Sequence, residues 1–147
     1  MILKRVFWAL VGIFLLILSQ LLVPVVRDLF RGSFLFLVPF AVFFLLGAAL
    51  IFLTYQKKVK GKLKKFLILT GASATGFFIS VLLHNLVYGL LITIFGVDFW
   101  NKIGLGDEPL FFLLAIIVCP IGFLVGVVGS IILLPDRYNK KSNEKKI

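Results

Sequence analysis

The chain carries a single histidine, His84, inside an apolar stretch, ISVLLHNLVYGL, that covers residues 79–90. Ser80, His84 and Tyr88 follow one another at intervals of four residues, so in a helix their side chains share one side. Asn85 is rotated by about 100° from His84 on the same helix. These hydroxyl, imidazole, phenol and amide groups could hold a ligand, pass a proton or satisfy backbone groups. Ionisable side chains in membrane segments are candidates for function by default.

Two acidic residues, Asp107 and Glu108, lie in the loop that follows this stretch. If Lys65 marks the inner headgroups, His84 comes 19 residues later, about 28 Å up a straight helix and near the outer edge of the hydrocarbon. We therefore expect a polar cluster that faces the bundle interior near the outer loops. Its expected members are Ser80, His84, Asn85, Tyr88, Asp107 and Glu108. Two roles stay open: a structural one, satisfying loop carbonyls or the acidic turn, and a ligand or proton role.

Metal and redox chemistry find little support in the composition. A protein metal site needs three or four ligands, and one histidine with two nearby acids is a thin set. We therefore expect no metal and no cofactor. Cys119 is the only cysteine, which excludes an internal disulfide and a Cys-x-x-Cys redox centre. We interpret Cys119 as a small packing residue.

The elements that position these residues follow from hydropathy. Hydrophobic residues make up 61% of the chain, against about 45–50% in soluble domains, so lipid must be the solvent. About 20 apolar residues cross a bilayer as a helix, and strands of a transmembrane barrel would alternate in a way that is absent here. The sequence predicts an all-α fold, a single integral membrane bundle over residues 1–135. Its four spans cover about 6–26, 34–55, 66–95 and 109–134.

The charges predict how the chain is inserted. With both termini in the cytoplasm, 13 of the 16 Lys and Arg residues face inward, which the positive-inside rule favours strongly. We expect a multi-pass protein of the cell membrane, with residues 136–147 as a disordered basic tail. A lysine-rich connector should meet an anionic inner leaflet, as an ordinary anchor or as a headgroup site, and we expect no nucleic-acid partner. Its lysines are Lys57, Lys58, Lys60, Lys62, Lys64 and Lys65.

Small residues recur along the last two spans. In lipid, helices associate where small residues let their backbones approach closely. We therefore expect the third and fourth spans to form the tightly packed pair of the bundle. The residues predicted for this packing are Gly71, Ala72, Gly76, Ala115, Cys119, Gly122, Gly126 and Gly129.

Several local features qualify this outline. The first two spans should form a hairpin around a short turn at residues 27–33, and Gly61 could end the second helix with a left-handed residue. The third apolar stretch is too long for one crossing, so it should tilt, bend or break near Gly89 or Gly96. The fourth span should break or kink at Cys119-Pro120.

The blocks GASATGFFISVLLHNLVYG and GDEPLFFLLAIIVCPIGFLVG resemble segments of an uncharacterised group of small prokaryotic four-helix membrane proteins. The resemblance covers the third and fourth spans, and it implies no activity. Small multidrug exporters have a similar size and span count but need a buried glutamate in the first helix, which this chain lacks.

Three functions follow from these observations. The first is a non-enzymatic membrane protein that acts by helix–helix assembly, with itself or with a larger membrane partner, and that carries a polar cluster at the outer leaflet. The second is a small transporter or channel subunit whose path is lined by Ser80, His84, Asn85 and Tyr88. The third is a membrane enzyme using His84, which ranks last because no nucleophile or metal set accompanies that residue.

Overall fold

The computed structural model describes the backbone of residues 2–30 and 33–144, and the side chains of these residues as far as 134. Within these ranges the chain forms helices and no strands. Four of the described helical segments are long and apolar enough to cross a membrane: Ile2–Leu22, Phe34–Gln56, Gly61–Phe95 and Pro109–Leu134. The prediction of an all-α chain with four helices of membrane-spanning length is therefore confirmed.

The first connection is more helical than expected. Helix α1 (Ile2–Leu22) ends just before Pro24, which opens a second, short helix, α2 (Pro24–Phe30). The turn predicted at residues 27–33 therefore starts later, after Phe30. Proline suits the first position of a helix because its missing N–H has no partner there in any case. The chain thus begins a new helix where we had expected it to reverse.

The second span starts with a 3-10 turn, η1 (Phe34–Leu37), which leads into α3 (Val38–Gln56). Gln20 of α1 is almost fully buried, and its Nε2 donates a hydrogen bond of 3.0 Å to the carbonyl oxygen of Phe36. This bond ties α1 to the start of the next span. The Gln20 oxygen Oε1 is buried without a hydrogen-bond partner among the described residues.

The lysine-rich connector reverses the chain in four residues, 57–60. Helix α3 ends at Gln56, and Lys58 adopts a left-handed conformation with a φ of 47°. Gly61, with a φ of 69°, is instead the first residue of helix α4 (Gly61–Phe95). The expectation that Gly61 ends the second helix is wrong, because so short a reversal needs its left-handed residue directly after the helix.

Helix α4 runs without interruption for 35 residues, about 52 Å at 1.5 Å per residue. Gly89 does not break it, since glycine inside a helix costs only about 1 kcal/mol relative to alanine, and the helix continues on both sides of it. Gly96, with a φ of 93°, ends the helix and donates its N–H to the Ile92 carbonyl. Of the two expected break points, Gly96 ends the helix and Gly89 lies within it.

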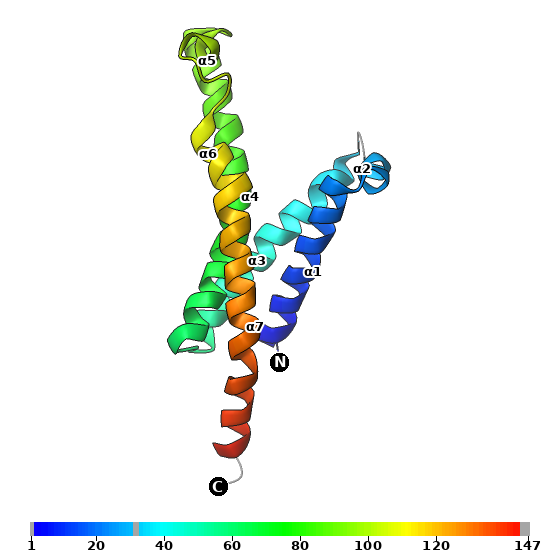
Figure 1. The fold of residues 1–147 in the computed structure, drawn as a ribbon, viewed down its shortest axis with the longest axis vertical. Coiled ribbons are helices and arrows are strands. Elements are labelled where there is room, and N and C mark those ends of the chain that lie inside the picture. Colours follow the sequence, from blue (N-terminus) through cyan, green and yellow to red (C-terminus); the bar gives the residue numbers. More distant parts are fainter. Residues whose placement is uncertain (1, 31–32, 145–147) are drawn as a thin grey trace.

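The fourth span passes Pro120 without the expected break. It consists of α6 (Pro109–Leu113), one π-helical turn, η2 (Leu114–Val118), and α7 (Cys119–Glu144). The N–H of Cys119 bonds to the carbonyl of Leu114, five residues earlier. Such a wide turn is one way in which a helix accommodates an irregularity. In Figure 1 the segment forms one nearly continuous rod beside α4.

The backbone of α7 remains helical as far as Glu144. The sequence had predicted a disordered tail from residue 136, and residues 145–147 of that tail lie outside the described part of the chain. Extending an existing helix adds one hydrogen bond for each residue that is fixed, whereas starting a new helix is costly. A polar segment that directly follows a long helix can therefore continue it.

The helices form two arms (Figure 1). The α4/α7 arm contains α4, α5 (Phe99–Lys102), α6, η2 and α7, and the α1/α3 arm contains α1, α2, η1 and α3. The arms meet near the end that carries both termini and the connector 57–60, which we call the lysine end. They lean apart toward the opposite end, where α2 and α5 lie and which we call the loop end.

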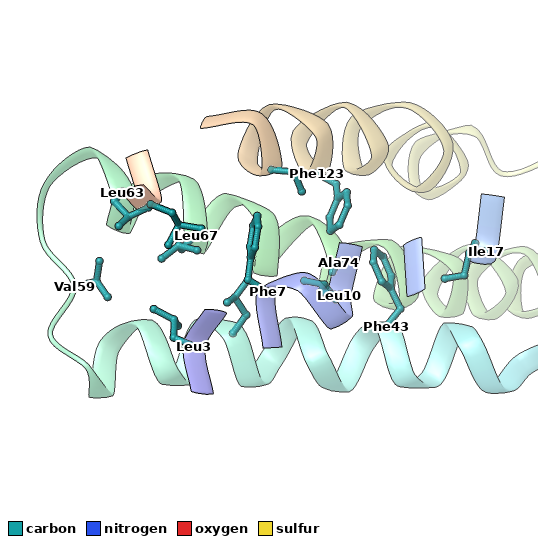
Figure 2. Close-up of a cluster of buried hydrophobic side chains, with 13 residues drawn as sticks. Leu3, Phe7, Leu10, Ile17, Phe43, Val59, Leu63, Leu67, Ala74 and Phe123 are labelled. Atoms are coloured by element: carbon teal, nitrogen blue, oxygen red, sulfur yellow. The ribbon is translucent and has the colours of Figure 1, made fainter. Parts of the chain in front are cut away.

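The hydrophobic core fills the lysine-end half. Figure 2 shows its buried side chains, including Phe7, Leu10 and Leu67, packed between the two arms. At the point where the arms begin to separate, the ring of Phe123 lies 4.4 Å from Phe14 and 5.2 Å from Phe43, measured between ring centroids. The buried residues of α4 end at Ser80. The core therefore joins the arms over half of the molecule only.

Candidate functional site

The predicted polar cluster centres on Glu108 at the loop end. Glu108 is the N-cap residue of α6, and its Oε1 accepts a hydrogen bond of 2.8 Å from the N–H of Leu110. The N–H of Phe111 donates to both carboxylate oxygens, at 3.2 and 3.0 Å. A negative charge at a helix N-terminus is favourable because unpaired N–H groups point toward it. Glu108 is only 4% exposed, so this cap is almost closed to the surroundings.

His84 connects α4 to this cap. Its Nδ1 lies 3.2 Å from Glu108 Oε2 and also 3.2 Å from the Glu108 carbonyl oxygen. Its Nε2 lies 3.8 Å from Oδ1 of Asp107. Asp107 is more exposed, and the same Oδ1 accepts a 2.7 Å hydrogen bond from the N–H of Glu108. The imidazole therefore lies between two carboxylates that belong to one turn.

Aromatic rings extend the cluster toward α5. Tyr88 stacks on Trp100 with a centroid distance of 5.9 Å and an interplanar angle of 6°. The His84 ring packs 5.7 Å from the ring of Phe112 on α6. Trp100 is buried, and its Nε1 has no hydrogen-bond partner among the described residues. Its loop position gave no signal of burial, because a tryptophan after a span usually marks the interface.

Two predicted members lie elsewhere. Ser80 is buried one turn below His84, away from the carboxylates of the α6 cap. Asn85 points away from the cluster, is exposed, and donates from Nδ2 to the carbonyl of Val81 on its own helix at 2.8 Å. Its rotation of about 100° from His84 carries it past the edge of the interface with α6. The expectation that Asn85 faces the bundle interior does not agree with this geometry.

The hydrogen-bonding groups of the cluster are paired with one another. The Glu108 carboxylate is used by two backbone N–H groups and by His84, and Asp107 is used by the N–H of Glu108. Among the described residues, no group of three or more His, Cys, Asp and Glu side chains could hold a metal ion. The arrangement is what a structural connection between α4 and the start of the next span requires.

The glycines of α7 contact α4 at very short range. A Cβ added at Gly122 would lie 2.6 Å from Ser73 Oγ, and one added at Gly126 would lie 2.7 Å from the backbone N of Thr70. Gly129 lies against the ring of Phe66. Ala115 is buried, and a Cβ at Gly76 would meet the sulfur of Cys119 at 3.4 Å. These residues bring the two backbones of the α4/α7 arm together.

Two residues predicted for this contact belong to other surfaces. Gly71 faces α3, where an added Cβ would lie 2.8 Å from the Gly47 carbonyl oxygen and 2.7 Å from a side-chain carbon of Ile51. Ala72 is exposed. Sequence reasoning missed Gly47, although it is the one glycine in the second span, between leucine and alanine, and that isolation was an available signal. This glycine pair joins the two arms.

The six lysines of the connector 57–60 and the start of α4 form an exposed basic surface rather than a pocket. Five of them are exposed, and Lys64 is half-buried with its Nζ 4.4 Å from the centre of the Tyr55 ring. Val59 is the buried residue of the connector and packs into the core. The exposed five are Lys57, Lys58, Lys60, Lys62 and Lys65.

A further surface, absent from the sequence expectations, lies on the outer side of α4. Asn85, Gly89 and Thr93 occur at intervals of four residues and are all exposed, and we call this set the Asn85 stripe. A Cβ added at Gly89 would meet nothing within 4 Å. The stripe is flanked by exposed leucines: Leu82, Leu86 and Leu90.

Comparison of the chain with protein-family models, with curated proteins and with solved structures gives no match. The function must therefore be argued from the chain's own geometry.

Proposed function

We propose that this chain is an integral membrane protein that assembles with a second copy of itself through the Asn85 stripe. The observation that carries the proposal is the exposure of Asn85, Gly89 and Thr93 on one side of an apolar helix. The glycines of α7, which the sequence offered for helix–helix assembly, are already covered by α4. Assembly therefore needs another face, and the stripe is open.

The exposed apolar surface supports placement in a membrane. Large hydrophobic side chains are exposed along every span, among them Leu45, Leu86 and Leu124, which are 62%, 62% and 51% exposed. In water such surfaces would associate or aggregate, whereas lipid is their natural surrounding. Both termini and the lysine connector lie at the same end (Figure 1). With the excess of basic residues at that end, the positive-inside rule favours a cytoplasmic lysine end.

Asn85 is costly if it faces lipid alone. Its Nδ2 bonds to its own helix, but its Oδ1 has no hydrogen-bond partner among the described residues. Asn85 follows Lys65 by 20 residues, about 30 Å along the helix, so it lies near the outer edge of the hydrocarbon. A polar group that faces acyl chains there without a partner still costs free energy, and an asparagine across a helix pair can satisfy it. Since an amide both donates and accepts, Asn85 can pair with the same residue of a second copy around a two-fold axis.

The rest of the stripe fits such a contact. Gly89 lets a facing backbone approach closely, and the Thr93 hydroxyl already bonds to the Gly89 carbonyl at 2.8 Å, so it brings no unsatisfied donor. The apolar stretch 66–97 is about 48 Å long as a helix, well beyond a hydrocarbon core of about 30 Å. A second copy packed there would cover apolar surface that extends past the lipid.

The other two hypotheses gain no specific support from the geometry. A path lined by the four predicted side chains would need all of them on one open face, but Ser80 is buried and Asn85 is exposed on a side of α4 turned away from His84 and Tyr88. A catalytic His84 would need a free nitrogen toward a substrate, whereas both of its nitrogens face the carboxylates of the α6 cap.

The decisive experiment measures the oligomeric state of the purified full chain in liposomes by single-molecule photobleaching over a range of protein-to-lipid ratios. We expect a dimer for the unmodified chain. Gly89→Leu should raise the dissociation constant about tenfold or more, since close packing and polar contacts between helices contribute about 1–2 kcal/mol. Asn85→Leu should act in the same direction.

The matched control is Gly12→Leu on α1, because Gly12 is exposed and an added Cβ there also meets nothing within 4 Å. This variant should remain dimeric. A chain that stays monomeric at every ratio, or a dimer that tolerates Gly89→Leu, would overturn the proposal. A monomer that co-purifies with another membrane protein would replace the second copy by that partner.

Orientation is tested separately. In a Cys119→Ser background, Lys60→Cys should react with a membrane-impermeant maleimide only after the cells are permeabilised. Reaction in intact cells would place the lysine end outside and reverse the assignment.

A further inference from the structure

A slot lies where the two arms begin to separate. All four spans contribute to its walls, and its volume is about 70 Å³. On the same measure, roughly 10–15 Å³ admits one water-sized group, so the slot has room for several such groups. It is lined by Phe14, Ile17, Leu18, Leu21, Phe43, Ser73, Phe77, Cys119, Pro120 and Phe123.

The chemistry of the walls selects an apolar occupant. Ser73 and Cys119 are the two lining residues with polar side-chain atoms, and Ser73 is nearly buried against Gly122 of α7. A water molecule needs two to four polar partners, which phenylalanine and leucine walls do not offer. An empty slot would deprive its lining of van der Waals contacts. A hydrocarbon group restores these contacts.

The depth of the slot narrows the choice further. On α4, Ser73 and Phe77 follow Lys65 by 8 and 12 residues, which is about 12 and 18 Å along the helix. In a hydrocarbon core of about 30 Å, the slot therefore lies at the middle of the membrane. The terminal parts of lipid acyl chains meet at this depth. The headgroups lie about 15 Å away on either side.

With a volume of about 70 Å³, the slot is too small for a helix, whose diameter with side chains is about 10–12 Å. It is partly open to the surroundings, and its lining residue Leu21 is 45% exposed. A lipid beside the protein can therefore insert a chain end without any rearrangement of the bundle.

We propose that this slot binds the terminal part of a phospholipid acyl chain, at the junction of the α1/α3 and α4/α7 arms. The bound chain fills the space between Phe14, Phe77 and Phe123 and fixes the separation of the arms. This inference rests on the membrane placement proposed above but not on dimerisation, because the slot and the Asn85 stripe share no residue.

The test uses the full chain in phosphatidylcholine liposomes that contain a small fraction of photoreactive phosphatidylcholine. One probe carries a diazirine at the end of an acyl chain, and a second carries it near the glycerol. After irradiation, mass spectrometry locates the labelled residues. The chain-end probe should label Ile17, Cys119 and Phe123 more strongly than the exposed Leu124, which serves as the reference for bulk lipid. The glycerol-proximal probe should not label the slot.

A pair of variants on α1 separates the slot from the general lipid surface. Leu21→Trp fills the slot and should lower labelling of Cys119 and Phe123 to the level of Leu124. Leu22→Trp is the control, because Leu22 is 74% exposed and lies outside the slot, and it should leave the labelling unchanged. Thermal unfolding of both variants verifies that they fold. If Leu21→Trp does not fold, Leu18→Phe is used as the variant that fills the slot.

Slot residues labelled no more than Leu124, or equal losses in the Leu21→Trp and Leu22→Trp proteins, would overturn the inference. Photobleaching of the same liposomes reports the dimer. Loss of slot labelling with an intact dimer would therefore contradict the lipid site alone, and a labelled monomer would contradict the assembly alone.

Discussion

The two halves of α4 are both rich in leucine and isoleucine, yet they are packed differently. From Leu63 to Ser80 the helix buries seven residues against α3 and α7, and beyond Ser80 it buries none. The difference lies in small residues. The lysine-end half meets Gly47, Gly122 and Gly126 at backbone distance, whereas the loop-end half is held to α6 by a polar cap. Along α4, close backbone approach rather than hydrophobicity distinguishes the packed half from the open one.

The arms separate where bulky rings replace glycines. Phe40 and Phe43 of α3 lie against Phe77 of α4, with centroid distances of 6.0 and 6.5 Å. Phe123 of α7 completes this aromatic group. Rings of this size keep the helix backbones apart. The rings thus mark the boundary between the packed half and the open half, and the slot lies beside them.

The largest expected effect comes from removing close approach in the packed half. Gly126→Leu places a side chain against the backbone of α4. Its Cβ alone would lie 2.7 Å from the backbone N of Thr70 and 3.0 Å from the carbonyl oxygen of Phe66. Because backbone atoms cannot move away as a side chain can, we expect the free energy of unfolding to fall by about 3 kcal/mol or more, measured by unfolding in mixed detergent micelles. Gly12→Leu is the control and should be nearly neutral. Equal stability of both variants would contradict the role assigned to backbone contact.

An intermediate effect is expected in the open half. Glu108→Ala removes the cap of α6 and the partner of His84, so we expect a loss of about 1–2 kcal/mol in the same unfolding assay. Glu108→Gln keeps an acceptor for Leu110 N–H and should retain most of the stability. Asp107→Ala, at a more exposed position, should cost less than Glu108→Ala. A reversed order would show that Asp107, and not Glu108, carries the cap.

The smallest effect concerns Gln20. Gln20→Leu removes one hydrogen bond to the Phe36 carbonyl, but it also removes the buried oxygen that has no partner among the described residues. Because these changes oppose each other, and hydrogen bonds between membrane helices average about 0.6 kcal/mol, the stability should change by less than about 1 kcal/mol. A loss above about 2 kcal/mol would indicate that the loop end of the α1/α3 arm depends on polar contacts, as the α6 cap does.

Much of the fold could be predicted from the sequence because hydropathy reports span length directly. The four helices follow from hydropathy, and the proximity of His84 to Asp107 and Glu108 follows from spacing and helix rise. Which helix packs against which cannot be predicted in this way. Gly71 could have faced α7 or α3, and a helix that is apolar all round gives no amphipathic signal to decide between them. The contact with Gly47 emerges only when three helices are placed together.

The candidate site shows the same limit at single-residue scale. The spacing placed Ser80, His84 and Tyr88 on one side of α4, but the neighbour of His84, Asn85, lies beyond the edge of the interface. A rotation of about 100° separates His84, which contacts the α6 cap, from Asn85, which is exposed on the outer side of α4. Sequence alone gives the angle between two side chains, and the position of the second helix determines which of them it covers.

The wide turn of η2 has a consequence for everything that follows it toward the loops. A π turn carries one residue more than an α-helical turn, so the piece from Pro109 to Leu113 is wound by about 100° beyond where a regular helix extended from Cys119 would leave it. Glu108 reaches His84 with this extra winding included. The number of residues between Pro120 and the acidic turn thus determines the direction in which Glu108 points. Removing one residue would turn its carboxylate to a different side of the fourth span, away from His84.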